Sequence, residues 1–163
     1  MLTSRLRELV VGHRGANLAR ANLAGADLPG ANLSNANLCG AILDNARLCG
    51  VNLTNSNLTK AFLIDADLTA ANLRESRLVE ASLAGAILEC ADLSNADLSA
   101  VNLTDSDLIR ANLTCANLNG ATLTKAYLAD TNLTDALIGA FDLRDANLES
   151  VKGIDVNSLK TND

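Results

Sequence analysis

One five-residue pattern occupies most of the chain and limits what it can fold into. From Ala16 to Ser150 the pattern repeats 27 times without a gap, which accounts for 135 of the 163 residues. With the central residue of each unit called i, position i is Leu in 26 units and Ile138 in the other. Position i−2 is Ala in 20 units, and position i−1 is Asn or Asp in 18. Such regularity indicates a repeat architecture rather than a globule with one three-dimensional core.

A period of five is incompatible with both ordinary secondary structures. In an α-helix five residues advance by about 500°, so successive leucines would wind all round the helix. In a flat strand an odd period would place successive leucines on opposite faces. The chain must therefore turn within every unit. Position i+2 is Gly, Asn or Asp in 15 of the 27 units, and these residues tolerate a positive φ or bond back to the local backbone. We predict an all-β solenoid with one corner per pentapeptide.

Composition agrees with a solenoid and excludes several kinds of partner. The chain is 48% hydrophobic but only 2% aromatic, so Leu and Ala must fill the interior. The net charge of −6 argues against nonspecific binding to nucleic acid or to anionic membrane surfaces. No apolar run approaches the length of a membrane span. We therefore expect no direct nucleic-acid binding and no membrane association.

The A(D/N)LXX unit resembles the pentapeptide-repeat family, and the resemblance covers Ala16–Ser150. It implies a right-handed quadrilateral parallel β-helix, with four pentapeptides per coil and therefore about seven coils. It also implies that Leu at i and the small residue at i−2 both point inward. Phe141 is the one i−2 residue that is too large for this small site.

The segments outside the repeat are predicted to cap the solenoid, which divides the chain into 1–15, 16–150 and 151–163. In the first segment, Leu2 and Leu6 share one side at i, i+4 spacing, so we expect a short helix. This segment is too short and too charged for a secretory signal. An uncovered coil edge invites pairing with another molecule, so the C-terminal end is predicted to be plugged by its tail or to form an end-to-end homodimer. The candidate cap or dimer-contact residues are Leu137, Phe141, Ile154, Val156 and Leu159.

We find no catalytic constellation, no metal-ligand spacing and no cofactor motif in the sequence. His13 is the only His. The four cysteines lack a CxxC spacing, and their places in a twenty-residue coil bring no two within disulfide reach. Scattered free thiols are typical of a reducing cytoplasm. We predict a non-enzymatic, cytoplasmic protein that needs no cofactor or metal.

Polar residues recur at the outward positions in steps of twenty. One set stacks Asn or Asp at i−1 beside Ser or Thr at i+1, and its i−1 members are Asn32, Asn52, Asn72, Asp92, Asn112 and Asn132. Stacked at β-spacing, such amides and hydroxyls can bond between coils. We interpret this set as a structural ladder. An ice-binding Thr array is the less favoured alternative, because Arg74 interrupts the i+1 residues.

Function is predicted to lie on outward apolar residues. Ile42 and Phe62 should stack in adjacent coils with Ile64 beside Phe62, which gives a patch suited to docking an unidentified protein partner. A second outward group comprises Ile87, Ile109 and Tyr127. The leading hypothesis is a rigid scaffold for protein–protein interaction.

The alternative hypothesis comes from the family resemblance. Some members resemble B-form DNA in size and charge, bind DNA gyrase and confer quinolone resistance. Duplex DNA carries one charge per about 1.7 Å of axis, which is much denser than the charge of this repeat. The chain also lacks the loop insertions and the Phe-rich central positions of that subgroup.

Overall fold

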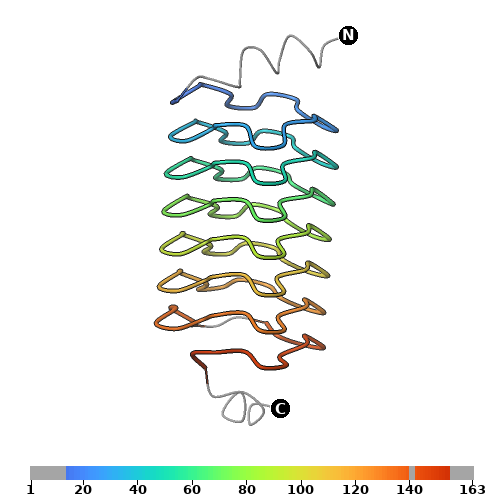
Figure 1. Ribbon diagram of the computed structural model, residues 1–163, viewed down its shortest axis with the longest axis vertical. Helices are drawn as coiled ribbons and strands as arrows, with labels where there is room; N and C mark the ends of the chain where they lie inside the picture. The colour runs from blue at the N-terminus through green and yellow to red at the C-terminus, as the bar shows by residue number, and fades with distance from the viewer. Residues whose placement is uncertain (1–13, 140–141, 155–163) are drawn as a thin grey trace.

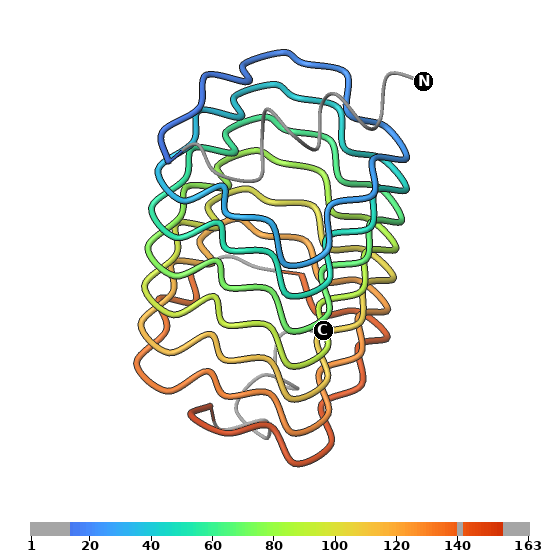
Figure 2. The ribbon, with the colours of Figure 1, turned by 45° about the horizontal axis from the view of Figure 1, so that its top comes forward.

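The computed structural model describes residues 14–139 and 142–154, which form an all-β solenoid of stacked coils (Figure 1). Its β-structure consists of single-residue parallel bridges at position i−1 of each pentapeptide. All 24 bridges join residues 20 positions apart, from Asn17 with Asn37 to Asn132 with Lys152. This register equals four pentapeptides, so residues 20 apart stack in vertical columns. Figure 2 shows that successive coils follow the same outline along the axis.

Most pentapeptides of the interior coils use the same set of backbone hydrogen bonds, as the unit centred on Leu58 illustrates. The N–H groups of Leu58 and Lys60 donate to carbonyls of the following coil, at 2.7 and 2.9 Å. The N–H of Asn57 donates to the preceding coil at 2.9 Å. The N–H of Ala61 donates to the carbonyl of Leu58 at 2.9 Å and closes a turn. Three bonds per unit therefore join coils, and one bends the chain.

The bend depends on a left-handed residue at i+2. Every described i+2 residue from Arg20 to Ser150 has a φ between 54° and 73°. The turn runs over four residues, from Leu at i to the i−2 residue of the next unit. Its third residue, at i+2, is the only one with a positive φ, as in a type II turn. The residue types predict a positive φ where i+2 is Gly, Asn or Asp, but Lys60 and Glu75 also have a positive φ. No i+2 residue is β-branched, which fits the steric cost of that conformation for branched side chains.

The core is a stack of Leu layers lined by small residues, as the resemblance implied. Every Leu from Leu23 to Leu133 at position i has 2% or less of its surface exposed. Every i−2 residue from Ala26 to Thr131 is also buried. Toward the ends, Leu18 and Leu148 are only partly buried. Burial of each interior Leu contributes roughly 1.5–3 kcal/mol, so the terminal layers gain less than the middle ones.

The predicted caps lie largely beyond the described residues. The N-terminal helix was placed in 1–15, of which only residues 14 and 15 are described. At the other end, the bridge of Lys152 to Asn132 extends the ladder two residues past the expected limit of the repeat. Within 14–139 and 142–154, no helix is long and apolar enough to cross a membrane.

Substitutions at the exposed corner residue Ala70 test the left-handed bend. Ala70 has a φ of 54°, which costs a β-branched residue more than Ala and costs Gly little. We expect Ala70→Val to lower the unfolding free energy by about 1–3 kcal/mol, and Ala70→Gly to leave it unchanged or raise it slightly. Urea unfolding of the three proteins measures this. Equal stability of the Val and Gly variants would contradict the assignment of the corner.

Candidate functional site

One backbone donor per unit, the N–H of position i+1, takes no part in the backbone ladder of the described coils. In 17 of the 18 units with Asn or Asp at i−1, the Oδ1 atom of that side chain accepts this N–H, at 2.9–3.3 Å. The exception is Asp27, whose i+1 residue is Pro29 and has no N–H. Asp27 instead pairs with Arg47 at 3.3 Å. The Asn/Asp preference is therefore explained by a local hydrogen bond within each unit.

Side-chain bonds between coils, which the sequence predicted for the polar ladder, are present but fewer. Asn112 Nδ2 donates to Asp92 Oδ1 at 3.2 Å, and Asn132 Nδ2 donates to the Thr114 hydroxyl at 3.0 Å. A similar bond joins Asn37 to Asn17 at 3.2 Å. The hydroxyls of Thr54, Thr104, Thr114 and Thr134 donate to the Asn Oδ1 of their own unit, at 2.6–2.7 Å. The polar columns thus mainly satisfy the backbone.

Nine units carry neither Asn nor Asp at i−1, and these units give up the local bond. In five of them the i−1 residue is apolar or aromatic: Ile42, Phe62, Ile87, Tyr127 and Leu137. Four of these side chains are strongly exposed, with 46% for Phe62, 42% for Ile87, 52% for Tyr127 and 59% for Leu137. Each lacks the local hydrogen bond, which is worth about 0.5–1.5 kcal/mol, and exposes apolar surface. Because the Leu core does not require an apolar residue at these outward positions, they are the best candidates for function.

The predicted patch residues Ile42, Phe62 and Ile64 lie together. Ile42 and Phe62 form a parallel bridge between adjacent coils, and Ile64 is in the same unit as Phe62. Phe62 and Ile64 are exposed, whereas Ile42 is half-buried and contributes less surface than predicted. The Ile64 N–H, deprived of an Asn at position 62, donates to Asp44 Oδ1 of the preceding coil at 2.9 Å. This compensating bond was not anticipated from the sequence, although Asp44 lies twenty residues before Ile64.

The C-terminal candidates have different environments. Leu137 is bridged to Asn117 and exposed, while Ile154 packs partly buried against the core. Phe141, Val156 and Leu159 lie outside the described residues. Whether these residues form a cap or a dimer contact stays a prediction.

Gly153 is a C-terminal residue whose role sequence analysis missed. It has a φ of 88°, and a Cβ there would lie 2.3 Å from the Thr134 backbone nitrogen and 2.5 Å from the Leu133 carbonyl carbon. The last turn therefore passes too close to the coil above it for any side chain. The available signal was a Gly at position i, where the repeat would place Leu.

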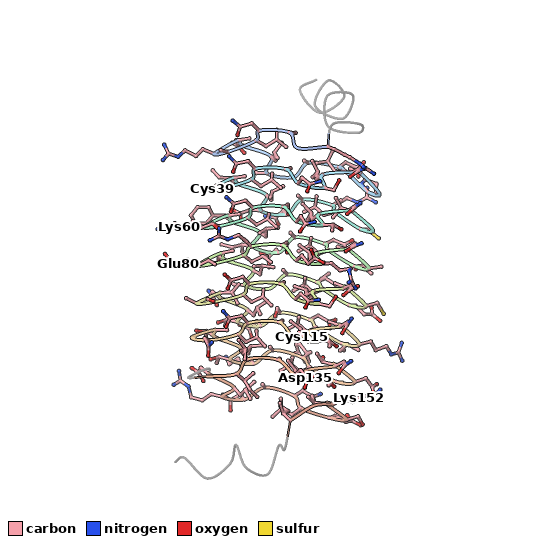
Figure 3. The ribbon with its side chains drawn as sticks, turned by 90° about the vertical axis from the view of Figure 1, so that its left-hand side faces the viewer. Cys39, Lys60, Glu80, Cys115, Asp135 and Lys152 are labelled. Atoms are coloured by element: carbon pink, nitrogen blue, oxygen red, sulfur yellow. The ribbon has the colours of Figure 1, made fainter. Side chains whose placement is uncertain are left out.

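The chemistry of the described surface is sparse. Its cysteines Cys39, Cys49, Cys90 and Cys115 are free thiols. Within the part of the chain that the structure describes, no three His, Cys, Asp or Glu side chains are grouped so that they could hold a metal ion. The ion pairs join exposed groups, such as Lys60 and Glu80 at 3.4 Å, which lie one above the other at the same edge in Figure 3.

Two carboxylates have shifted pKa values. Burial opposes ionisation of Asp92, but the nearby Ser94 hydroxyl and the hydrogen bonds from the Ser94 amide and from Arg74 outweigh it, so the pKa of Asp92 lies below its ordinary value. Hydrogen bonds from Arg144 hold the pKa of Asp142 well below its usual range. Both shifts have local structural causes within polar columns, and neither indicates a catalytic acid or base.

Stacked pentapeptides with inward Leu and outward polar columns define a β-solenoid repeat protein. Sequence comparison identifies the family within this class. The family model for pentapeptide repeats matches the chain in eight copies, with matches at residues 16–55, 31–69, 50–83, 66–105, 76–114, 102–139 and 111–152. The chain belongs to the pentapeptide-repeat family. No curated protein matches the sequence.

Solved structures of the family resemble this chain. HetL, a pentapeptide repeat protein involved in heterocyst differentiation regulation from the cyanobacterium Nostoc sp. strain PCC 7120, is 27% identical over 93% of this chain and 92% of its own, with a TM-score of 0.34. The protein alr5209, also from Nostoc, is 30% identical over 82% and 86%, with a TM-score of 0.27. QnrB1, a plasmid-mediated fluoroquinolone resistance protein, is 20% identical over 91% and 87%, with a TM-score of 0.44.

The charge of Asp92 should make a pH-dependent contribution to stability. The pKa of Asp92 in the folded protein lies below its ordinary value, so the stabilisation is present above the unfolded pKa and is lost as pH falls through the folded pKa. We expect Asp92→Asn to be less stable than the native protein near pH 7 and the difference to shrink as pH falls below about 4. Urea unfolding at several pH values measures it. A difference that is constant with pH would refute this assignment.

Gly153→Ala tests the close approach at the C-terminal end. The added Cβ clashes with backbone of the preceding coil, so the ladder bonds of Lys152, at 2.8 and 2.9 Å, should be lost. We expect a loss of about 1–3 kcal/mol and faster amide exchange at Leu133. Gly50→Ala is the matched control, because its φ is also positive but nothing lies within 4 Å of its Cβ. Equal losses of stability in the two variants would mean that the positive φ alone causes the loss, and would contradict the proposed clash at Gly153.

Proposed function

We propose that this protein is a non-enzymatic, rigid scaffold that docks a partner protein on the patch formed by Ile42, Phe62 and Ile64. The observation that carries the proposal is the exchange made at Phe62. The chain gives up the hydrogen bond that Asn or Asp supplies elsewhere and leaves the ring 46% exposed. Asp44 then supplies the lost bond to the Ile64 amide, so the exchange leaves the backbone satisfied.

Rigidity of the surface supports docking. The patch residues belong to coils that are bonded above and below by backbone bonds of 2.7–3.0 Å. Ile42 and Phe62 are bridged directly, and their units have buried Leu43 and Leu63 on the inner side. A side chain on such a surface is held in place before a partner arrives, so little ordering entropy opposes binding.

The finer architecture belongs to the same proposal. We propose a right-handed coil with four sides, capped by a helix within residues 1–15 and by a tail within 151–163, and able to associate end to end through the C-terminal residues. The twenty-residue bridge register supports four sides. We place the protein in the cytoplasm, which is compatible with four free thiols.

A role as a DNA-mimic inhibitor of DNA gyrase lacks a specific supporting observation. The likeness to QnrB1, at 20% identity and a TM-score of 0.44, does not carry an argument about function. Duplex DNA presents a charge every 1.7 Å or so, whereas Ile87 and Tyr127 interrupt the acidic residues along one column of this solenoid. We therefore favour the docking scaffold.

Phe62→Asn separates docking from stability. Asn at i−1 restores the residue that the repeat uses in 12 other units, so we expect unchanged or slightly higher thermal stability together with loss of partner capture. Affinity capture from the source cell, quantified for the native protein and the variant, measures the loss.

Thr122→Asn is the matched control for this experiment, because residue 122 occupies the same column as Phe62 and is not apolar. The partner should be retained by the native protein and by the Thr122 variant and lost by the Phe62 variant. If every captured protein is retained by Phe62→Asn, the patch is not the docking site.

A further inference from the structure

A second outward column combines exposed apolar side chains with acidic ones. We call it the acidic column; its i−1 residues are Asp27, Arg47, Asp67, Ile87, Asp107, Tyr127 and Asn147. The bridges place Asp107 directly between Ile87 and Tyr127. Ile87 is 42% exposed and Tyr127 is 52% exposed. Both belong to units that lack the local hydrogen bond of Asn or Asp, so the column shows the same exchange as Phe62, at two positions around a carboxylate.

The charges around these two side chains are mainly negative. The four units concerned carry the carboxylates of Asp67, Glu89, Asp107 and Asp130 and the guanidinium of Arg110, a net charge of −3 from four acids and one base. The ion pairs found among residues 14–139 and 142–154 include none of these four carboxylates. Arg47, the cation at an i−1 position of this column, is already paired with Asp27. The surface therefore offers unpaired negative charge beside apolar area.

The spacing along the column suits a helix rather than an extended strand. Adjacent coils lie roughly 4.8 Å apart, so Ile87 and Tyr127 are separated by roughly 9.6 Å with Asp107 halfway. In an α-helix, residues i and i+7 are separated by about 10.5 Å and residue i+3 or i+4 lies midway. In a strand, same-side residues recur about every 6.8 Å and would fall out of register. The column's i−1 N–H groups are also already bonded to the preceding coil, which leaves them unavailable for strand addition.

We propose that the acidic column is a second docking surface, and that its occupant is a basic amphipathic helix of a partner protein lying along the solenoid axis. Its apolar residues at i and i+7 contact Ile87 and Tyr127. A Lys or Arg at i+3 or i+4 pairs with Asp107, whose Oδ1 accepts the Ile109 N–H at 2.9 Å and whose second oxygen is free for a cation. This surface is distinct from the Phe62 patch and does not depend on it.

The probe is a synthetic helix-stabilised peptide roughly 18 residues long, with Leu at i and i+7 and Arg at i+3 and i+4. Binding to the full-length protein is measured by fluorescence anisotropy at low and high salt. A peptide with Glu in place of both Arg residues is the probe control. We expect the basic peptide to bind more weakly as salt rises, and the acidic peptide to bind at least about tenfold more weakly than the basic one.

Variants to Asn test each contact while keeping the repeat intact, because Asn already occupies i−1 in 12 units. The double variant Ile87→Asn with Tyr127→Asn should lose at least about tenfold in affinity. Asp107→Asn keeps the acceptor for Ile109 but removes the charge, so affinity should fall about threefold or more and depend less on salt. Phe62→Asn is the control and should bind the peptide as the native protein does.

Three results would overturn the proposal. The first is no binding of the basic peptide to the native protein at concentrations up to about 1 mM. The second is equal binding of the basic and acidic peptides, which would indicate apolar adhesion without charge recognition. The third is an equal loss of affinity in Phe62→Asn and in the Ile87/Tyr127 double variant, which would place the peptide elsewhere. Because Phe62 and the acidic column are tested by different variants, failure of one docking surface is distinguishable from failure of the other.

Discussion

The left-handed corner at i+2 is the constraint on which the rest of the structure depends. By bending the chain after every Leu, it brings an odd period back to the same side, so that Leu and the small i−2 residue always face the axis. Described corner residues keep φ between 54° and 73° whether they are Gly50, Lys60 or Glu75. Non-glycine residues pay a steric cost there, and repeated burial of Leu with three inter-coil backbone bonds per unit offsets it.

Accounting for backbone donors explains the residue preferences of the outward positions. In most units of the interior coils, four N–H groups are used by the ladder and the turn, and the fifth, at i+1, donates to Oδ1 where i−1 is Asn or Asp. The unit with Pro29 at i+1 supports this explanation. Because Pro has no N–H, Asp27 has no local donor and pairs with Arg47 instead. An apolar residue at i−1 is therefore a measurable departure from the repeat. In a protein whose interior is uniform, such departures are where the chain distinguishes itself from any other solenoid of the same length.

Much of the candidate site, including the adjacency of Ile42 and Phe62, was predictable once the family resemblance had set twenty residues per coil. Its energetics were not. The bond from the Ile64 N–H to Asp44 joins residues twenty apart and depends on side-chain direction, and the smaller exposure of Ile42 depends on what lies around it. The closeness of Gly153 to the backbone of Thr134 likewise arises only when the last coil is placed under the one before it.

The amino-acid sequence was sufficient to predict the solenoid fold, the inward and outward positions and the family, because within the repeat a period of five buries every Leu only if the chain turns in each unit. The folded structure was needed to show that every described corner is left-handed even without Gly, that the i+1 N–H is the spare donor, and which apolar residues remain exposed. The structure also places the carboxylate of Asp107 between the apolar side chain of Ile87 and the aromatic ring of Tyr127 in one column. These properties depend on contacts between residues twenty apart, and a local pattern specifies such contacts only after the coil register is known.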